Sequence, residues 1–299
     1  MRLVTFASAR ADAPAATRAG ILDGDRVYPF AGADVDLASI VAGTHAGHPG
    51  TADAVPLADV RLRAPLPRPG KIICVGLNYR DHCREQDVAE PAYPMLFAKF
   101  ANAVNDPGGV VLRPRATEKL DLECELAVVI GRRATRIGPD EAMAAVFGYT
   151  VLNDVTMRDL QREDRQWLRA KGSDGFAPIG PVIVTADELD PGRGLRMRSA
   201  VNGEPWQESS TEEMIFDVPT LVAFASRTIT LEPGDIIATG TPAGVGHFHD
   251  PPRYVRGGDV MRCEIEGIGA LENPVVDETP RTDDHAAAAG VAELARAAR

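Results

Sequence analysis

The chain has 299 residues, of which 25% are charged and 44% hydrophobic, and its formal net charge is −11 at pH 7. This composition is typical of a globular protein, and the negative charge argues against nucleic acid or an anionic membrane as a partner. No apolar run approaches the length of a membrane span, and the first residues lack the apolar core of a signal peptide, so we expect a cytoplasmic protein.

The first 70 residues predict a small β-rich lobe and a linker. Short strand-like runs occur at 3–7, 19–22, 26–29 and 60–62, with a Gly24-Asp25 turn between two of them and a short helix candidate at 35–41. We therefore assign 1–63 to an N-terminal lobe and the proline-rich stretch 64–70 to a linker.

Residues 71–277 predict the main domain. Strand-like runs lie at 71–75, 95–98, 110–112, 122–131, 147–153, 181–184, 196–201, 235–239 and 259–265, and helix candidates at 78–87, 139–145, 155–166 and 217–226. Many strands and few helices in a non-alternating order predict a mainly β protein with some α (α+β), a mixed β-sandwich or roll rather than a doubly wound sheet. The tail 278–299 is charged and then alanine-rich, and we assign it no role.

The four cysteines predict neither a structural zinc site nor a redox motif, because no two of them form a Cys-x-x-Cys pair. Cys74, Cys124 and Cys263 lie in apolar runs and are expected to be reduced core residues. Cys83 lies in a polar stretch and is expected to be accessible.

Glu123 and Glu125 begin an apolar run that ends at Ile130. Alternate residues of a strand share a face, so both carboxylates point the same way. An isolated Glu-x-Glu is most often the solvated face of a strand, but Ala127 and Val129 continue this face, which therefore goes into protein. Buried carboxylates repel one another unless they are neutralised. A hard cation with oxygen ligands does this, which predicts Mg²⁺ or Mn²⁺, with Ca²⁺ as a further candidate.

Asp154 ends a second apolar run and supplies a third carboxylate. The residues after it predict the start of a helix, on which Asp154, Arg158 and Gln161 share one face. The guanidinium of Arg158 suits a substrate carboxylate. An exposed helix face with a routine ion pair explains the same spacing equally well.

His82 and Glu85 are three residues apart in a predicted helical turn, so their side chains can touch. A carboxylate fixes the tautomer of its histidine and raises its basicity, which makes the pair a candidate general base. For an arbitrary pair of this kind, a routine contact on a surface helix is the commoner explanation.

Lys171 lies in a tight loop, where its ammonium would stabilise a developing oxyanion or enolate, although a solvated lysine is the simpler explanation. Lys99 follows an apolar strand and is expected to face the same pocket. A further strand runs into a glycine-rich loop with Gly240 and Thr241, which suits an anionic ligand or a plain turn. This loop matches no nucleotide-binding pattern.

Together these segments resemble the fumarylacetoacetate hydrolase family over roughly 71–276. The carrying motifs are Gly76-Leu77-Asn78-Tyr79-x-x-His82-x-x-Glu85, Leu120-Asp121-x-Glu123-x-Glu125-Leu126-Ala127-Val128-Val129-Ile130-Gly131, Gly148-Tyr149-Thr150-x-x-Asn153-Asp154-x-Thr156-x-Arg158-Asp159-x-Gln161, Lys171-Gly172-x-Asp174, Pro178-x-Gly180-Pro181 and Thr239-Gly240-Thr241-Pro242-x-Gly244-Val245-Gly246.

The resemblance implies a mixed β-sandwich roll that is usually a homodimer and holds Mg²⁺ or Mn²⁺. The residues it implies are the metal carboxylates Glu123, Glu125 and Asp154, the catalytic His82 and Glu85 on a lid, and the anion-binding or oxyanion-stabilising Arg158, Gln161, Lys171 and Thr241.

The expected function is a metal-dependent hydrolase that cleaves a C–C bond in an acylpyruvate-type 2,4-dioxo acid through a metal-bound enolate. In this mechanism His82 activates a water for attack on C4, and Lys171 helps to hold the pyruvate enolate. Decarboxylation of oxaloacetate or a related β-keto acid, and hydratase, isomerase or lyase chemistry on a 2-oxo acid, use the same residues. A binding protein without activity is disfavoured by the complete residue set.

The rest of the substrate is expected to contact the lid at 83–94 and the segment 206–218. Trp206, Met214 and Phe216 form a candidate apolar wall there, with core packing as the alternative role for each.

Overall fold

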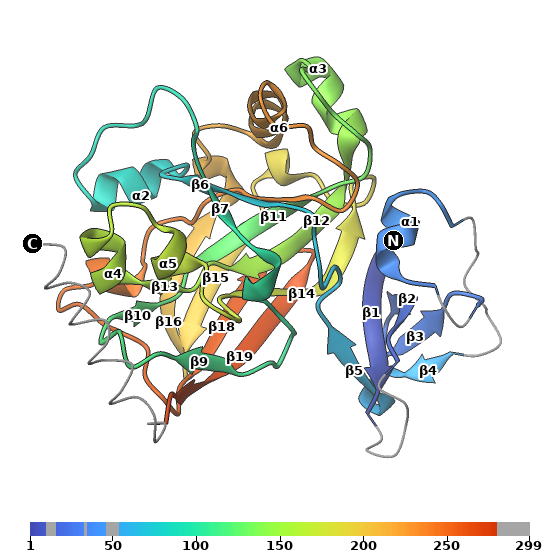
Figure 1. Cartoon of the computed structure of the whole chain (residues 1–299), viewed down its shortest axis with the longest axis horizontal. Helices are drawn as coiled ribbons and strands as arrows, with labels where there is room; N and C mark the ends of the chain where they lie inside the picture. Colours follow the sequence, from blue (N-terminus) through green and yellow to red (C-terminus); the bar gives the residue numbers. More distant parts are fainter. Residues whose placement is uncertain (10–15, 33–34, 46–53, 280–299) are drawn as a thin grey trace, which may run out of the picture.

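The computed structural model describes residues 1–9, 16–32, 35–45 and 54–279 (Figure 1). Of the predicted tail 278–299, residues 280–299 lie outside the described ranges. Within the described ranges, no helix combines the length and the apolar composition that a membrane crossing requires.

The larger of the two main sheets is mixed and has the strand order β4-β3-β2-β1-β14-β12-β11-β17-β6-β7. In addition, β5 pairs with β1, and β8 pairs with β14. Its strands are β1 (Arg2–Ser8), β2 (Arg18–Asp23), β3 (Arg26–Pro29), β4 (Val55–Pro56), β5 (Val60–Arg63), β6 (Ile72–Gly76), β7 (Met95–Lys99), β8 (Val104–Asn105), β11 (Cys124–Ile130), β12 (Val146–Asn153), β14 (Ala177–Thr185) and β17 (Ile236–Ala238). The N-terminal strands join this sheet where β1 pairs antiparallel with β14, and they lie on the right in Figure 1.

A second sheet has the strand order β16-β15-β18-β19-β9. Its strands are β9 (Val111–Arg113), β15 (Arg196–Val201), β16 (Glu204–Ser210), β18 (Val260–Ile265) and β19 (Gly269–Asp277). A two-stranded ladder pairs β10 (Leu120–Asp121) with β13 (Thr156–Met157). The mainly β architecture of mixed sheets is therefore confirmed.

In the described part of the chain, six short α-helices lie around these sheets (Figure 1). They are α1 (Leu37–Val41), α2 (Arg80–Glu85), α3 (Pro139–Ala142), α4 (Arg158–Glu163), α5 (Leu168–Lys171) and α6 (Val218–Ser226). Asp217 caps α6 by accepting a hydrogen bond from the Thr220 amide, as the Asp-Val-Pro signal predicts. Helices α2, α4 and α5 gather at one end of the larger sheet, away from the N-terminal strands.

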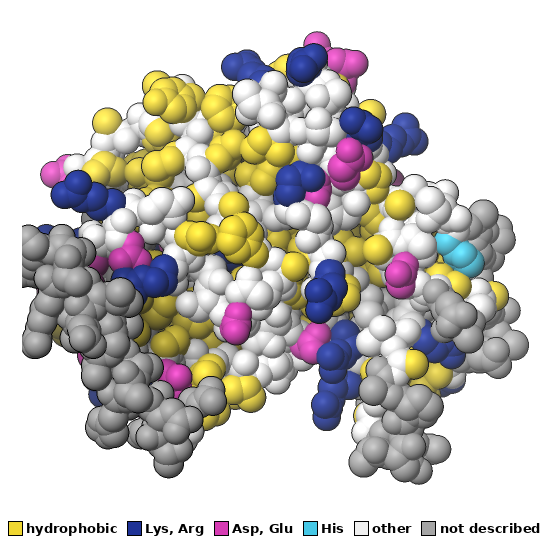
Figure 2. Space-filling view, viewed as in Figure 1, with side chains coloured by type: hydrophobic (Ala, Val, Ile, Leu, Met, Phe, Trp, Pro, Cys, Tyr) yellow, Lys and Arg dark blue, Asp and Glu magenta, His cyan; other side chains and the backbone are white. Residues whose placement is uncertain are grey.

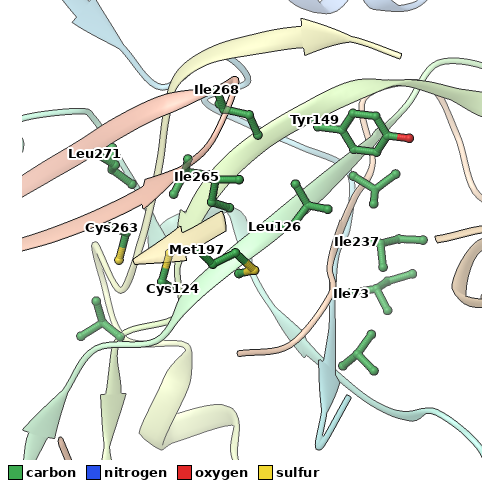
Figure 3. Close-up of a cluster of buried hydrophobic side chains, with 14 of the residues drawn as sticks. Ile73, Cys124, Leu126, Tyr149, Met197, Ile237, Cys263, Ile265, Ile268 and Leu271 are labelled. Atoms are coloured by element: carbon green, nitrogen blue, oxygen red, sulfur yellow. The ribbon is translucent and has the colours of Figure 1, made fainter. Parts of the chain in front are cut away.

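The core forms where the second sheet packs on β11 and β12 (Figure 3). Met197, Ile265 and Leu271 face Leu126 across this interface, and all four side chains are buried. Removing these apolar groups from water is the main force that holds the two sheets together. Strand β11 is buried along its whole length, as its apolar run at 126–130 predicts.

Several sequence expectations differ from the structure. Strands β16 and β19 lie where we predicted no regular structure, and the expected helix at 155–166 is divided into β13 and the short helix α4. Lys171 ends helix α5 rather than lying in a loop. Cys83 is buried, not accessible, because its side of α2 packs inward and its sulfur lies 3.9 Å from the Leu77 carbonyl.

Candidate active site

Three buried carboxylates converge where β11 begins and β12 ends. The antiparallel register pairs Cys124 with Asn153, which places Glu123 and Asp154 beside each other, and the Asp154 amide donates to the Glu123 carbonyl at 2.9 Å. Glu125 points to the same place, because alternate residues share a face. One carboxylate oxygen from each of Glu123, Glu125 and Asp154 lies within 4.8 Å of the others.

Three buried cations, Lys171, Arg158 and Lys99, surround these carboxylates. Lys171 Nζ lies 2.8 Å from Glu123 Oε2 and 2.9 Å from Asp154 Oδ2, and it also donates to Thr156 Oγ1 at 2.8 Å. Arg158 Nη1 lies 2.7 Å from Glu123 Oε1. Burial alone raises the pKa of Glu123, but Lys171 and Arg158 outweigh it and lower this pKa to about 2. Glu123 is therefore ionised at any neutral pH.

Glu125 has a different environment from its neighbours. Its Oε2 accepts a hydrogen bond from the Gly240 amide at 3.0 Å, but no lysine or arginine of the described ranges forms an ion pair with it. Burial raises the pKa of Glu125 well above its ordinary value, and Asp154 and Glu123 raise it further. A cation bound between the three carboxylates would favour the ionised form of Glu125, and the oxygen-only set fits Mg²⁺ or Mn²⁺.

Lys99 lies behind this cluster. Its ammonium pairs with Asp154 Oδ1 at 2.6 Å and donates to the carbonyls of Phe176, at 2.7 Å, and Lys171. The side chain is fully buried and is not among the residues that line the adjacent cavity. Contrary to the expectation from sequence, Lys99 does not face the pocket; it balances Asp154 from the protein side.

Asp121 is a site residue that sequence reasoning did not single out. Its Oδ2 accepts hydrogen bonds from Arg158 Nε at 2.8 Å and from the His247 amide at 3.0 Å, and its Oδ1 accepts one from the Gly246 amide at 2.9 Å. The residue is fully buried. A single carboxylate thus fixes both the arginine and the glycine-rich loop.

We predict that Asp121→Asn destabilises the protein by about 3–5 kcal/mol, because it leaves the buried Arg158 charge without one of its partners. Urea unfolding followed by circular dichroism measures this loss. Asp277→Asn is the matched control, since Asp277 is about half exposed and also pairs with an arginine. Equal midpoints for the two variants would contradict this role of Asp121.

Arg158 and Gln161 lie together, but not for the reason expected. Asp154 precedes β13 and is not helical, so no helix face joins it to Arg158. Arg158 instead begins α4 and contacts Gln161 Oε1 through Nη1 at 3.1 Å. Its buried Nη2 has no hydrogen-bond partner among the described residues. This leaves one donor of the guanidinium free for a ligand in the cavity that Arg158 lines.

His82 and Glu85 form a close pair on α2. His82 Nδ1 lies 2.5 Å from Glu85 Oε1, and Glu85 Oε2 accepts a hydrogen bond from the Gly244 amide at 2.8 Å. A carboxylate accepts, so Nδ1 carries the proton and Nε2 is the basic atom. The Gly244 contact also ties α2 to the glycine-rich loop.

The glycine-rich loop after β17 closes the site from one side. Gly240 has φ +96°, and a Cβ there would meet the Val75 carbonyl at 2.8 Å, so only glycine fits. Thr241 Oγ1 donates to the Cys124 carbonyl at 3.1 Å and accepts from Gln207 Nε2 at 2.7 Å. Gln207 is a buried residue of β16, a strand that sequence reasoning missed.

A cavity of about 610 Å³ opens onto these groups. Its lining includes Glu123, Glu125, Lys171, Arg158, Gln161, Thr241 and His82, whereas Lys99, Gly240, Glu85 and Asp154 do not line it. The apolar wall consists of Met95, Phe97, Trp167 and Phe248 rather than the expected Trp206, Met214 and Phe216. Of the segment 83–94, Gln86 contributes to the lining.

Charges of both signs are interspersed on the face of the molecule in Figure 2. The net charge of −11 is therefore not gathered into one acidic field on that face, and it does not oppose an anionic ligand there.

The chain is similar to several curated proteins. A mitochondrial oxaloacetate tautomerase of Xenopus laevis is 45% identical over 221 residues, which are 73% of this chain and 69% of that protein. A mitochondrial oxaloacetate tautomerase of Bos taurus is 46% identical over 74% of this chain and 71% of its own length. An uncharacterized protein of Methanocaldococcus jannaschii is 51% identical over 71% of this chain and 85% of its own length.

Solved structures show the same architecture. A fumarylacetoacetate hydrolase of Exiguobacterium antarcticum superimposes with a TM-score of 0.81 at 40% identity, over 93% of this chain and all of that one. A 2-hydroxyhepta-2,4-diene-1,7-dioate isomerase of Mycobacterium marinum gives 0.78 at 37% identity, over 94% of this chain and all of that one. The family model for the C-terminal domain of fumarylacetoacetate (FAA) hydrolase matches residues 71–276. This chain therefore belongs to the fumarylacetoacetate hydrolase family.

Proposed function

We propose that this protein is a divalent-metal-dependent enzyme that moves a proton at C3 of a 2-oxo acid. The observation that carries the proposal is one cavity lined both by the carboxylates Glu123 and Glu125 and by His82. A 2-oxo acid needs these two functions together, because its C3 proton becomes acidic only when the adjacent carbonyl is polarised.

Glu123, Glu125 and Asp154 would hold the cation, with Mg²⁺ or Mn²⁺ as the first candidates and Ca²⁺ as the third. When bound, the cation would act as a Lewis acid toward the carboxylate and the 2-oxo oxygen of the substrate. Lys171 would remain beside Glu123, where its positive charge favours negative charge developing on the substrate oxygen.

His82 would carry the proton. Glu85 holds the Nδ1 proton, so Nε2 is free to accept a proton from C3 or to return it. In the keto-to-enol direction, the C3–H bond breaks, its electron pair forms the C2–C3 double bond, and the 2-oxo oxygen gains a proton from solvent. The reverse direction returns the proton from His82 to C3.

Arg158 and Gln161 would orient the acid. The free Nη2 donor of Arg158 suits a carboxylate oxygen, and the Gln161 amide lies beside it at the cavity wall. Holding the carboxylate fixes the C3 proton relative to the imidazole, which removes much of the entropic barrier.

The keto–enol interconversion of oxaloacetate is our first candidate reaction. It requires one acid–base group and one polarised carbonyl, and curated relatives 44–46% identical to this chain are described as oxaloacetate tautomerases. Decarboxylation of oxaloacetate would use the same substrate but needs no base at C3.

Hydrolysis of a C–C bond in an acylpyruvate is the second candidate. Its support is the volume of the cavity, about 610 Å³, which exceeds what a four-carbon acid fills. Here His82 would take a proton from water, and the hydroxide would attack the C4 carbonyl. Cleavage of the C3–C4 bond would then leave its electron pair on C3, and a proton returned to C3 would give pyruvate.

A substrate screen tests the proposal. The protein is supplied with Mg²⁺ or Mn²⁺ and mixed with oxaloacetate, acetylpyruvate or a longer acylpyruvate, and enol absorbance, CO₂ and pyruvate are followed. We expect loss of enol absorbance at unchanged total oxaloacetate. If no 2-oxo acid is converted faster than by the metal alone, the proposed function is wrong.

A further inference from the structure

A second cavity, of about 450 Å³, lies between β12, the turn 190–192 and the segment that leads into α6. Its inner surface is apolar and buried, with Met214 and Val218 in the wall. Three carboxylates, those of Asp190, Glu212 and Asp217, also line it, and their residues are exposed. None of these residues has a role in the proposed reaction.

Two buried polar side chains, those of Tyr149 and Thr211, line this cavity, and the Thr211 hydroxyl is already hydrogen-bonded to the Pro191 carbonyl. Tyr149 is fully buried, and its hydroxyl has no hydrogen-bond partner among the residues that the structure describes. Figure 3 shows this hydroxyl pointing away from the core cluster. Burial, with a contribution from Asp190, raises the pKa of Tyr149 to about 12, so the phenol keeps its proton. An unpartnered buried donor costs free energy that a ligand with an acceptor would recover.

The charges around the opening favour a cation. The lining includes three carboxylates and no lysine or arginine. Two arginines lie nearby: Arg193 Nε is 3.4 Å from Asp190 Oδ2, and Arg80 Nη1 donates to the backbone carbonyl of Met214 at 2.5 Å. Asp190 and Asp217 also accept backbone hydrogen bonds from Gly192 and Thr220, which fixes their positions. An ammonium group at the opening would therefore meet the carboxylates of Glu212 and Asp217, which form no ion pair with any described residue.

We propose that this cavity is a binding site for a small primary amine. The ammonium lies at the carboxylates of the opening, an apolar body contacts Met214 and Val218, and a hydrogen-bond acceptor at the inner end meets the Tyr149 hydroxyl. The volume of 450 Å³ lies in the range of small-molecule sites.

Calorimetric titration of the full chain at low ionic strength tests this site, with 4-methoxyphenethylamine as the probe. Phenethylamine lacks the acceptor, and 3-(4-methoxyphenyl)propionate keeps it but reverses the charge. We expect the probe to bind about 2–10-fold more tightly than phenethylamine. It should bind roughly tenfold more tightly than the propionate. Equal binding of the amine and the propionate would overturn the proposal.

Tyr149→Phe is the decisive variant. Its hydroxyl has no described partner, so the variant should fold with an unchanged or slightly higher Tm. It should also remove the advantage of the methoxy compound over phenethylamine. Glu212→Gln should weaken both amines about 2–5-fold, because it removes one exposed carboxylate.

Tyr254→Phe is the matched control. Tyr254 contacts His247 Nδ1 at 2.9 Å beside the catalytic cavity, so its change should leave binding of the probe unaltered. If Tyr254→Phe weakens the probe and Tyr149→Phe does not, the amine occupies the catalytic cavity and the proposal is wrong. This outcome leaves the proposed 2-oxo acid chemistry untouched.

Discussion

Replacing His82 with glutamine is expected to lower kcat/KM for oxaloacetate tautomerisation by about 100- to 10,000-fold. The amide keeps most of the volume of the imidazole but cannot accept the C3 proton. Hydrolysis of an acylpyruvate should fall by a similar factor, because a water would lose the same base. Stopped-flow measurement of the enol absorbance gives the rate directly.

Oxaloacetate decarboxylation provides the internal control for His82. Loss of CO₂ needs no base at C3, so any decarboxylase rate of the wild-type protein should persist within a few-fold in His82→Gln. His249→Gln is a second control, since His249 contacts the Gly244 carbonyl and does not line the cavity. A wild-type tautomerisation rate in His82→Gln would show that another group moves the proton.

Glu125→Gln is expected to weaken Mn²⁺ binding by at least about 100-fold, since removal of groups that merely support metal ligands already costs 10- to 100-fold. Glu125 has no ion-pair partner in the described chain, so this change breaks no salt bridge and the metal-free protein should keep its stability. Glu123→Gln would instead disturb Lys171 and Arg158. Electron paramagnetic resonance of free Mn²⁺ measures the affinity, and Glu208→Gln, an exposed change, is the control.

We also predict that the affinity for Mn²⁺ depends on pH. The pKa of Glu125 is raised, so this carboxyl holds a proton below its raised pKa and the metal must displace it. The Mn²⁺ affinity should therefore rise with pH, by up to about tenfold per pH unit when one proton is released. Glu125→Gln should remove this slope. A wild-type affinity that does not change between pH 5 and pH 8 would contradict the assignment.

The clustering of the three candidate metal carboxylates was predictable because strands have a simple period. Glu123 and Glu125 alternate before an apolar run, and the hairpin of β11 and β12 carries Asp154 to them. The N-terminal strands were also predictable, because turn residues separate their short apolar runs. Both signals are local in the sequence.

Asp121 and Gln207 were not predictable in this way. Asp121 acts through atoms far away in the chain, the amides of Gly246 and His247, and nothing near it in the sequence marks that contact. Gln207 lies on β16, whose sequence Glu-Pro-Trp-Gln-Glu-Ser-Ser is mostly polar because one face is solvated. The burial of Lys99 was also not predictable from the local sequence, since its partner Asp154 lies 55 positions away.

The charges buried around Asp154 impose an order on binding. Asp121, Glu123 and Asp154 balance Lys99, Lys171 and Arg158, so the described cluster is neutral while Glu125 holds its proton. A divalent ion that replaces this proton leaves one unit of positive charge in a buried region. That excess favours an anion, whereas the neutral cluster does not. The cation should therefore enter first, and the 2-oxo acid should bind weakly until it has.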